Sequence, residues 1–317
     1  GFKAEAQPRR PPQKLQLLVA LGRDVSPCRE APRARRAPEA RGRRQAAPGE
    51  LAPSDRSGGL PTGASVAGRV WELSQDARGC HLVQQALEDA GSDDARAALT
   101  RELYGHVWEA MKCRHANHVL QKCVTTMRAQ AVQFIIYEIS KEGATVRKAA
   151  RHQYGCRVLQ RLLEHCQSSQ VGDLVESLLL DALAIAKHAY GNYVIQHVFE
   201  HGTEDQRRRL GAQLRDHALT LGRDSKGCAV LGKALSYGVA EDRAALAWSL
   251  LREPGLLPAM ACSRHGHTVA KLVLEMSEER EEAQRQLEES LPALSASRYG
   301  RSVVTFLRAF EQDGRCP

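Results

Sequence analysis

The pattern His-Val-Phe-Glu-His is the arrangement in this sequence that could form an enzyme site. His197 and His201 are four residues apart, with Glu200 between them. On a helix this spacing places both imidazoles on one side, where they could hold a zinc ion with the glutamate as a base. A second copy of the segment reads Arg-Leu-Leu-Glu-His, so Arg161 replaces the first metal ligand. We therefore interpret the motif as repeated framework and expect no catalytic site, no metal and no cofactor.

The segment around this motif recurs along the chain. Each copy has a marker residue that directly follows a small glycine or alanine. Successive markers are 37, 39, 36, 36, 39 and 34 residues apart: Cys80, Asn117, Cys156, Asn192, Cys228, His267 and Arg301. A helical stretch precedes each copy, and no copy could bury its apolar face alone. The pattern predicts an all-α solenoid of six to seven stacked repeats, each built as a helix pair.

Within each copy the apolar residues follow the spacing of a packed helix. At 3.6 residues per turn, i, i+1, i+4 and i+5 form one stripe. The predicted core residues are Val194, Ile195, Val198 and Phe199 in one copy, and Val158, Leu159, Leu162 and Leu163 in the copy before it.

A polar pattern occupies a different face of the same helices. In four copies a glutamine stands four residues after the marker, one helical turn away, and a flat side chain follows the marker. Amides can hydrogen-bond base edges, and flat side chains can stack on bases, so the pattern predicts a surface for single-stranded nucleic acid. The predicted edge-reading residues are Cys80, Gln84, Asn117, Gln121, Cys156, Gln160, Asn192 and Gln196, and the predicted stacking residues are His81, His118, Arg157 and Tyr193.

On these motifs, "GCRVLQRLLEHC" and "GNYVIQHVFEHG" above all, residues from about 64 to 317 resemble the Pumilio-type (PUF) RNA-binding repeats. The resemblance implies a right-handed crescent of three-helix repeats that binds single-stranded RNA on its concave face. It also implies one base per repeat and an RNA strand antiparallel to the protein. In that family an Asn–Gln pair implies uracil and a Cys–Gln pair implies adenine. The four repeats would then read a core of 5′-UAUA-3′.

The last three copies depart from the family pattern. The fifth copy has Cys228, Ala229 and Gly232, where the family commonly reads guanine with Ser and Glu. The sixth has His267 and Lys271, which we expect to make weak RNA contacts at most. The seventh, with Arg301, Ser302 and Thr305, stands where the family has a closing half-repeat, so a capping role is expected. The array is therefore partly degenerate, and its C-terminal repeats could instead contact a protein.

The charge of the chain is concentrated at its start. Residues 1–60 hold 13 Lys/Arg against 6 Asp/Glu, whereas the rest of the chain holds 32 Lys/Arg against 31 Asp/Glu. Nine of the thirteen prolines lie in residues 1–62. This composition predicts a disordered Arg/Pro-rich region over 1–62 and a repeat domain over 63–317. The run "LQLLVALG" is far shorter than the roughly 20 residues of a membrane span, so no membrane association is expected.

The resulting functional hypothesis is a non-enzymatic, monomeric binder of single-stranded RNA. The family resemblance implies contact with 3′ untranslated regions of messenger RNAs, control of their translation or stability through recruited effector proteins, and a cytoplasmic location. Two alternatives stay open. One is a nucleolar role in ribosomal RNA processing, and the other is a protein-binding helical scaffold. The near-neutral charge of residues 61–317 favours the scaffold, but it does not explain four glutamines in register.

Overall fold

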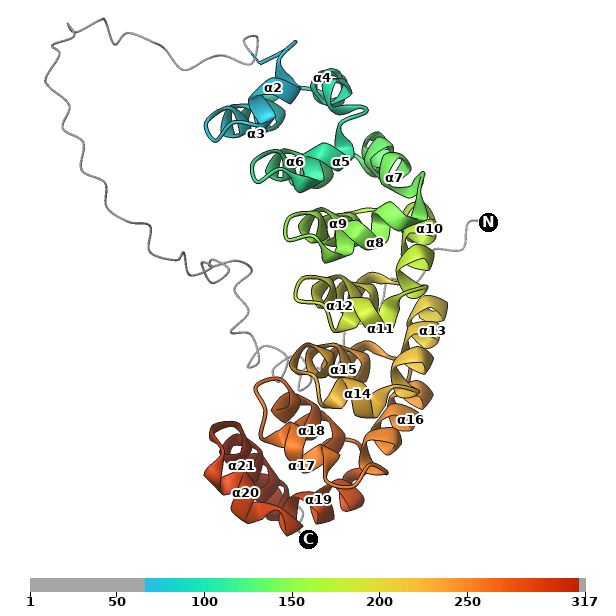
Figure 1. Cartoon of the computed structure of the whole chain (residues 1–317), viewed down its shortest axis with the longest axis vertical. Helices are drawn as coiled ribbons and strands as arrows, with labels where there is room; N and C mark the ends of the chain where they lie inside the picture. Colours follow the sequence, from blue (N-terminus) through green and yellow to red (C-terminus); the bar gives the residue numbers. More distant parts are fainter. Residues whose placement is uncertain (1–65, 314–317) are drawn as a thin grey trace, which may run out of the picture.

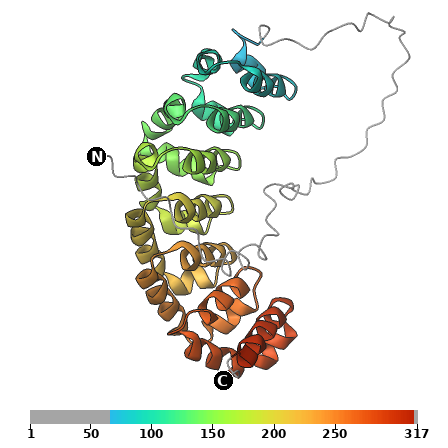
Figure 2. The same cartoon turned by 180° about the vertical axis from the view of Figure 1, so that it is seen from behind.

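The computed structural model describes residues 66–313, with side chains up to residue 309, and the predicted tail over 1–62 lies outside the described residues. The described part consists of helices and turns, without a strand. The helices stack in chain order into a crescent (Figures 1 and 2). The expected all-α solenoid is thus confirmed. None of the described helices is both long and apolar enough to cross a membrane.

Each of the first six repeats contains three helices rather than the predicted pair. The first repeat contains α2 (Val70–Ser74), α3 (Gly79–Asp89) and α4 (Asp93–Thr100), and the second contains α5 (Val107–Lys112), α6 (Ala116–Thr126) and α7 (Gln133–Ser140). The third contains α8 (Gly143–Arg151), α9 (Gly155–His165) and α10 (Ser168–Leu179), and the fourth contains α11 (Ala182–Ala186), α12 (Gly191–His201) and α13 (Glu204–Arg215). The fifth contains α14 (Ala218–Gly222), α15 (Ser225–Tyr237) and α16 (Ala240–Leu251), and the sixth contains α17 (Leu256–Ala261), α18 (Gly266–Leu274) and α19 (Arg280–Glu289). The pair α20 (Leu291–Ala296) and α21 (Arg298–Asp313) closes the array. Short 3-10 turns, η2 (Arg101–Leu103) and η3 (Ala129–Val132), follow α4 and precede α7.

The helix-pair prediction was wrong because the first helix of each repeat is short. These helices have five to nine residues, too few to show a clear apolar period. Tertiary contacts hold them instead. The Glu102 carboxylate accepts hydrogen bonds from the backbone N–H groups of Gly68 and Val70, both at 2.7 Å, at the start of α2. Glu138 of α7 does the same for Gly105 and Val107, at 2.7 and 3.3 Å, at the start of α5.

The core runs along the whole crescent between the helix layers. All eight predicted core residues of α9 and α12 are buried, which confirms the apolar stripe, and Phe199 is fully inaccessible to solvent. The helices that carry the markers pack each against the next, from α3 through α6, α9, α12, α15 and α18 to α21. They form the concave row of the crescent, and α4, α7, α10, α13, α16 and α19 lie on its convex side (Figure 1). We call the seven concave helices the reading row.

Candidate nucleic-acid interface

A glycine at the start of a reading helix lets that helix approach the short helix before it. A Cβ atom built on Gly191 would lie 2.8 Å from the Ile185 carbonyl oxygen, and one on Gly227 would lie 2.4 Å from that of Leu221. A side chain at either position would therefore clash with backbone. The close approach helps to bury the next residue, the marker, which is at most 4% exposed in each of the first five repeats.

In the two Asn repeats, the marker and the glutamine form a hydrogen-bonded pair. The Nδ2 of Asn192 donates to the carbonyl oxygens of His188 and Ala189 at 2.8 and 3.1 Å, and its Oδ1 accepts from Gln196 Nε2 at 3.0 Å. In α6, Asn117 Nδ2 donates to the Cys113 carbonyl at 2.8 Å and Oδ1 accepts from Gln121 Nε2 at 2.9 Å.

The two asparagines are only 1% and 4% exposed, whereas the glutamines are half-buried. The asparagine therefore serves as a buried anchor that fixes the rotation of the glutamine amide. The glutamine keeps its Oε1 and one N–H for a ligand on the concave side.

In the two Cys repeats, the marker thiol is also buried and bonds the preceding turn. Cys80 Sγ donates to the Ala77 carbonyl at 3.4 Å, and burial, followed by the nearby Asp76, raises the pKa of this thiol. Gln84 Nε2 donates to the Cys80 carbonyl at 3.0 Å. The neutral thiol is a small filler and weak donor, so the glutamine is the stronger polar group on offer.

Gln160, the glutamine of α9, differs from the glutamines of α3, α6 and α12 because it is buried, with only 3% of its surface exposed to solvent. Gln160 Oε1 accepts a hydrogen bond from Arg157 Nη1 at 3.4 Å, and Gln160 Nε2 has no hydrogen-bond partner among the described residues. Cys156 Sγ lies 3.5 Å from the Gln153 carbonyl oxygen. An unpaired buried amide N–H is costly, and this one would gain stability from an acceptor on a ligand.

The four predicted stacking residues lie beside these pairs. His81 and His118 are exposed, and Arg157 and Tyr193 are half-buried. Partial desolvation of the ring, and then the nearby His81 and His115, lower the pKa of His118, which favours a neutral ring at pH 7. The Arg157 guanidinium lies 5.5 Å from the Tyr193 ring centroid. The flat groups of α9 and α12 are therefore stacked on each other, and a base that enters between them must separate them.

Two side chains of the His-Val-Phe-Glu-His segment contact neighbouring repeats. His197 Nε2 contacts Glu164 Oε1 of the preceding reading helix at 2.7 Å, and Glu200 pairs with Lys233 of the following one. Glu88 pairs with Lys122 in the same way between α3 and α6. Within the described residues, no cluster of three His, Cys, Asp or Glu side chains is placed to hold a metal ion.

These inter-repeat ion pairs were missed by the sequence reasoning. The sequence did contain a signal for them. A glutamate stands eight residues after one marker, and a basic residue stands five residues after the next marker.

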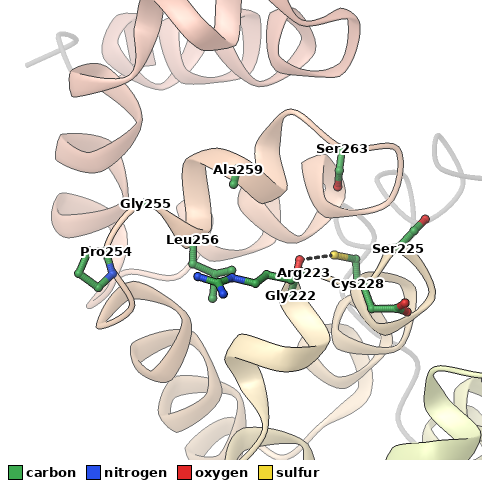
Figure 3. Close-up of a pocket in the computed structure, with 10 residues that line it drawn as sticks. Gly222, Arg223, Ser225, Cys228, Pro254, Gly255, Leu256, Ala259 and Ser263 are labelled. Carbon is green, nitrogen blue, oxygen red and sulfur yellow. Dashed lines mark hydrogen bonds between the residues drawn. The ribbon is translucent and has the colours of Figure 1, made fainter.

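The fifth repeat offers no base-reading group. Cys228 is 1% exposed, its Sγ donates to the Gly222 carbonyl at 3.0 Å, and burial raises the pKa of the thiol to about 11. A cavity of about 310 Å³ lies beside it, between the fifth and sixth repeats, lined by Arg223, Leu256 and Ser263 among others (Figure 3). With Ala229 and Gly232 at the stacking and glutamine positions, the concave side here has neither a flat group nor an amide.

In the sixth repeat, the two predicted weak-contact residues bind the closing helix. The His267 ring stacks on Tyr299 with centroids 5.3 Å apart, and Lys271 Nζ donates to Ser302 Oγ at 2.7 Å. Lys271 also lies 5.4 Å from the Phe306 ring centroid, and burial lowers its pKa.

This architecture defines a class: an α-solenoid repeat protein whose concave face presents an amide and a flat side chain in each of its first four repeats. Residues 69–103, 106–140, 150–179 and 181–214 each match the Pumilio-family RNA binding repeat, so these four segments are Pumilio-type repeats. The four matches coincide with the four repeats that carry a glutamine. They end before α14, in agreement with a partly degenerate array. The match is to a binding family rather than an enzyme family, as expected.

Known relatives agree with this assignment. A Pumilio domain-containing protein of Schizosaccharomyces pombe is 28% identical over 120 residues, which are 38% of this chain and 17% of that protein. Putative pumilio homolog 8 of Arabidopsis thaliana is 29% identical over 120 residues, 38% of this chain and 23% of that protein. The matched region thus spans about a fifth of the length of these relatives.

Among solved structures, PUF-8 in complex with PBE-RNA superposes with a TM-score of 0.70 at 25% identity, over 78% of this chain and 73% of that chain. The Puf3 RNA binding domain bound to a Cox17 RNA 3′ UTR site has a TM-score of 0.69 at 21% identity, with the same coverage. The second comparison shows the shared fold.

Proposed function

We propose that the protein binds single-stranded RNA on its concave face and reads one base with each of α3, α6, α9 and α12. The observation that carries the proposal is the hydrogen-bonded pair of a buried asparagine and a half-buried glutamine in α6 and α12, set beside a flat side chain and repeated in register. The fold is shared with PUF-8, which was crystallised with RNA. Neutral amides and flat groups suit base edges and base faces better than they suit a charged protein surface.

The hydrogen bonds within each repeat favour particular bases. In α6 and α12 the glutamine Nε2 is held by asparagine, so the free Oε1 and the remaining N–H face the ligand. An acceptor beside a donor complements uracil, whose N3–H lies next to a carbonyl oxygen. In α9 the Gln160 Oε1 is engaged by Arg157 and Nε2 is unpaired, which favours a base with an acceptor, such as adenine N1. This pattern supports uracil at α6 and α12 and adenine at α9, whereas adenine at α3 rests on the family resemblance alone.

With the antiparallel direction that the family resemblance implies, the preferred core is 5′-UAUA-3′, read by α12, α9, α6 and α3 in that order. The test is fluorescence anisotropy of short labelled RNAs that contain UAUA, compared with each single-base change. We expect UAUA to bind most tightly and every change to weaken binding, because a mismatched base leaves buried polar groups unpaired. Equal binding of all sequences, with affinity that collapses as salt rises, would refute base reading and assign binding to phosphate contacts of cationic side chains, such as those of the Arg-rich residues 1–60.

The biological role that fits this activity is control of messenger RNA translation or stability in the cytoplasm. Binding to 3′ untranslated regions would leave the convex helices open to effector proteins, and the four reading repeats lie on one chain, so a monomer suffices. Ribosomal RNA processing in the nucleolus is the second candidate, because a degenerate array also suits a larger RNA whose position is fixed by other contacts.

A further inference from the structure

The reading row changes character after α12. The helices α15, α18 and α21 carry no glutamine four residues after the marker, and the flat groups His267 and Tyr299 are stacked on each other. Lys271, at the glutamine position of α18, is bonded to Ser302 of α21. This half of the concave face therefore lacks the marker–glutamine pairs of the first four repeats.

The same half is enriched in positive charge. The stretches from five residues before to nine after each of the last three markers (223–237, 262–276 and 296–310) hold eight Lys/Arg against two Asp/Glu. The equivalent stretches of the first four repeats (75–89, 112–126, 151–165 and 187–201) hold eight Lys/Arg against five Asp/Glu. One of the two acids, Asp224, is occupied as a helix cap, because its Oδ1 accepts the N–H groups of Lys226 and Gly227 at 2.9 and 2.8 Å.

These cations lie along the reading row, most of them at the N-terminal ends of its last three helices. Lys226, Arg264 and Arg298 each stand two or three residues before a marker, and Arg301 is itself the marker of α21. The three arginines are exposed, and the Arg298 guanidinium lies 5.7 Å from the Tyr299 ring centroid. The positive ends of the α15, α18 and α21 dipoles point to the same edge. We call Lys226, Arg264, Lys271, Arg298 and Arg301 the basic tract.

We propose that the basic tract binds the phosphate backbone of the RNA strand, without reading its bases, on the 5′ side of the sequence read by α3 to α12. This rests on the proposed function, since the direction and register of the RNA come from it. Positive side chains without edge-reading amides suit phosphates, which carry charge but no sequence information. The C-terminal repeats would thus lengthen the footprint on the RNA and add affinity, while specificity stays with the four reading repeats.

The test uses the full chain and three RNAs: UAUA alone, UAUA with four abasic nucleotides at its 5′ end, and UAUA with the same extension at its 3′ end. Abasic nucleotides offer phosphates and sugars only. We expect the 5′ extension to tighten binding and to steepen the salt dependence by about 0.7 log units per log unit of salt for each phosphate contact. For three contacts this gain should shrink roughly twentyfold between 50 and 200 mM salt. The 3′ extension should add little.

The triple variant Arg264→Gln, Arg298→Gln and Arg301→Gln should lose the gain from the 5′ extension and leave binding of UAUA alone unchanged. Its matched control, Arg208→Gln, Arg252→Gln and Arg285→Gln, removes three exposed arginines outside the reading row and should keep the gain. The proposal is overturned if the 5′ abasic extension adds nothing, if both triple variants behave alike, or if the gain appears only with bases present. Failure of the proposed function has a different signature, namely loss of the preference for UAUA over its single-base changes.

Discussion

Phe199→Ala is expected to lower the free energy of unfolding by about 3–5 kcal/mol, a large part of the stability of an ordinary domain. Phe199 is fully buried in α12, and α12 packs against both α9 and α15. Truncation removes apolar contacts and leaves a cavity between repeats that have no other partner to fill it. Urea denaturation followed by circular dichroism measures the change.

The control for this prediction is Leu180→Ala, a similar loss of apolar side chain at a position that is 81% exposed. Its effect should stay within about 0.5 kcal/mol. Equal destabilisation by the two variants would mean that α12 is not packed as described.

Tyr193→Ala is expected to weaken binding of UAUA by about 1–3 kcal/mol, roughly 5- to 150-fold, with little effect on stability. The half-buried Tyr193 ring lies against Arg157 between two reading repeats, so its loss removes one face of the slot that a base would occupy. Anisotropy titration of the labelled RNA gives the change in Kd.

Thr268→Ala is the matched control, because Thr268 has the same place in the sixth repeat but lies beside the His267–Tyr299 stack rather than beside a reading glutamine. It should leave Kd unchanged. A loss at Tyr193 no greater than that at Thr268 would show that no base stacks at α12.

The solenoid and its core could be predicted from the sequence because a repeated apolar stripe leaves few alternatives. Val194, Ile195 and Val198 recur with equivalents one repeat earlier, and a stripe that cannot be buried within one repeat must be buried between repeats. The pairing of each marker with the glutamine four residues on followed from helix geometry alone, and in α6 and α12 the two side chains are hydrogen-bonded.

Other features depend on contacts that a helical period does not encode. The short helices, such as α11 with five residues, are held by tertiary contacts and carry no periodic signal. The depth of Asn117 and Asn192 is set by the close approach of two helices, so their role as buried anchors could not be seen in the spacing. The Arg157–Tyr193 stack joins residues 36 positions apart, and side-chain choices of that kind are made by packing in the folded state.

The division of the concave face suggests how a degenerate array can remain useful. Loss of the glutamine at Gly232 removes base reading locally, but helix stacking continues, because Val230, Leu231 and Leu235 of α15 are still buried. The proposed base-reading groups and the core residues lie on different helix faces. One can therefore be lost without the other.

The central claim is that one amide pair reads one base, and the double variant Asn192→Ser with Gln196→Glu tests it most directly. A carboxylate accepts but cannot donate, so it fits the two N–H donors on the guanine edge and disfavours the uracil carbonyls. The preference at the first base of UAUA should move from uracil to guanine by about tenfold or more, since a hydrogen bond to a charged group contributes roughly 1.5–3 kcal/mol. The other three bases should be read as before. A variant that still prefers uracil there, or that loses selectivity at all four positions together, would contradict the account.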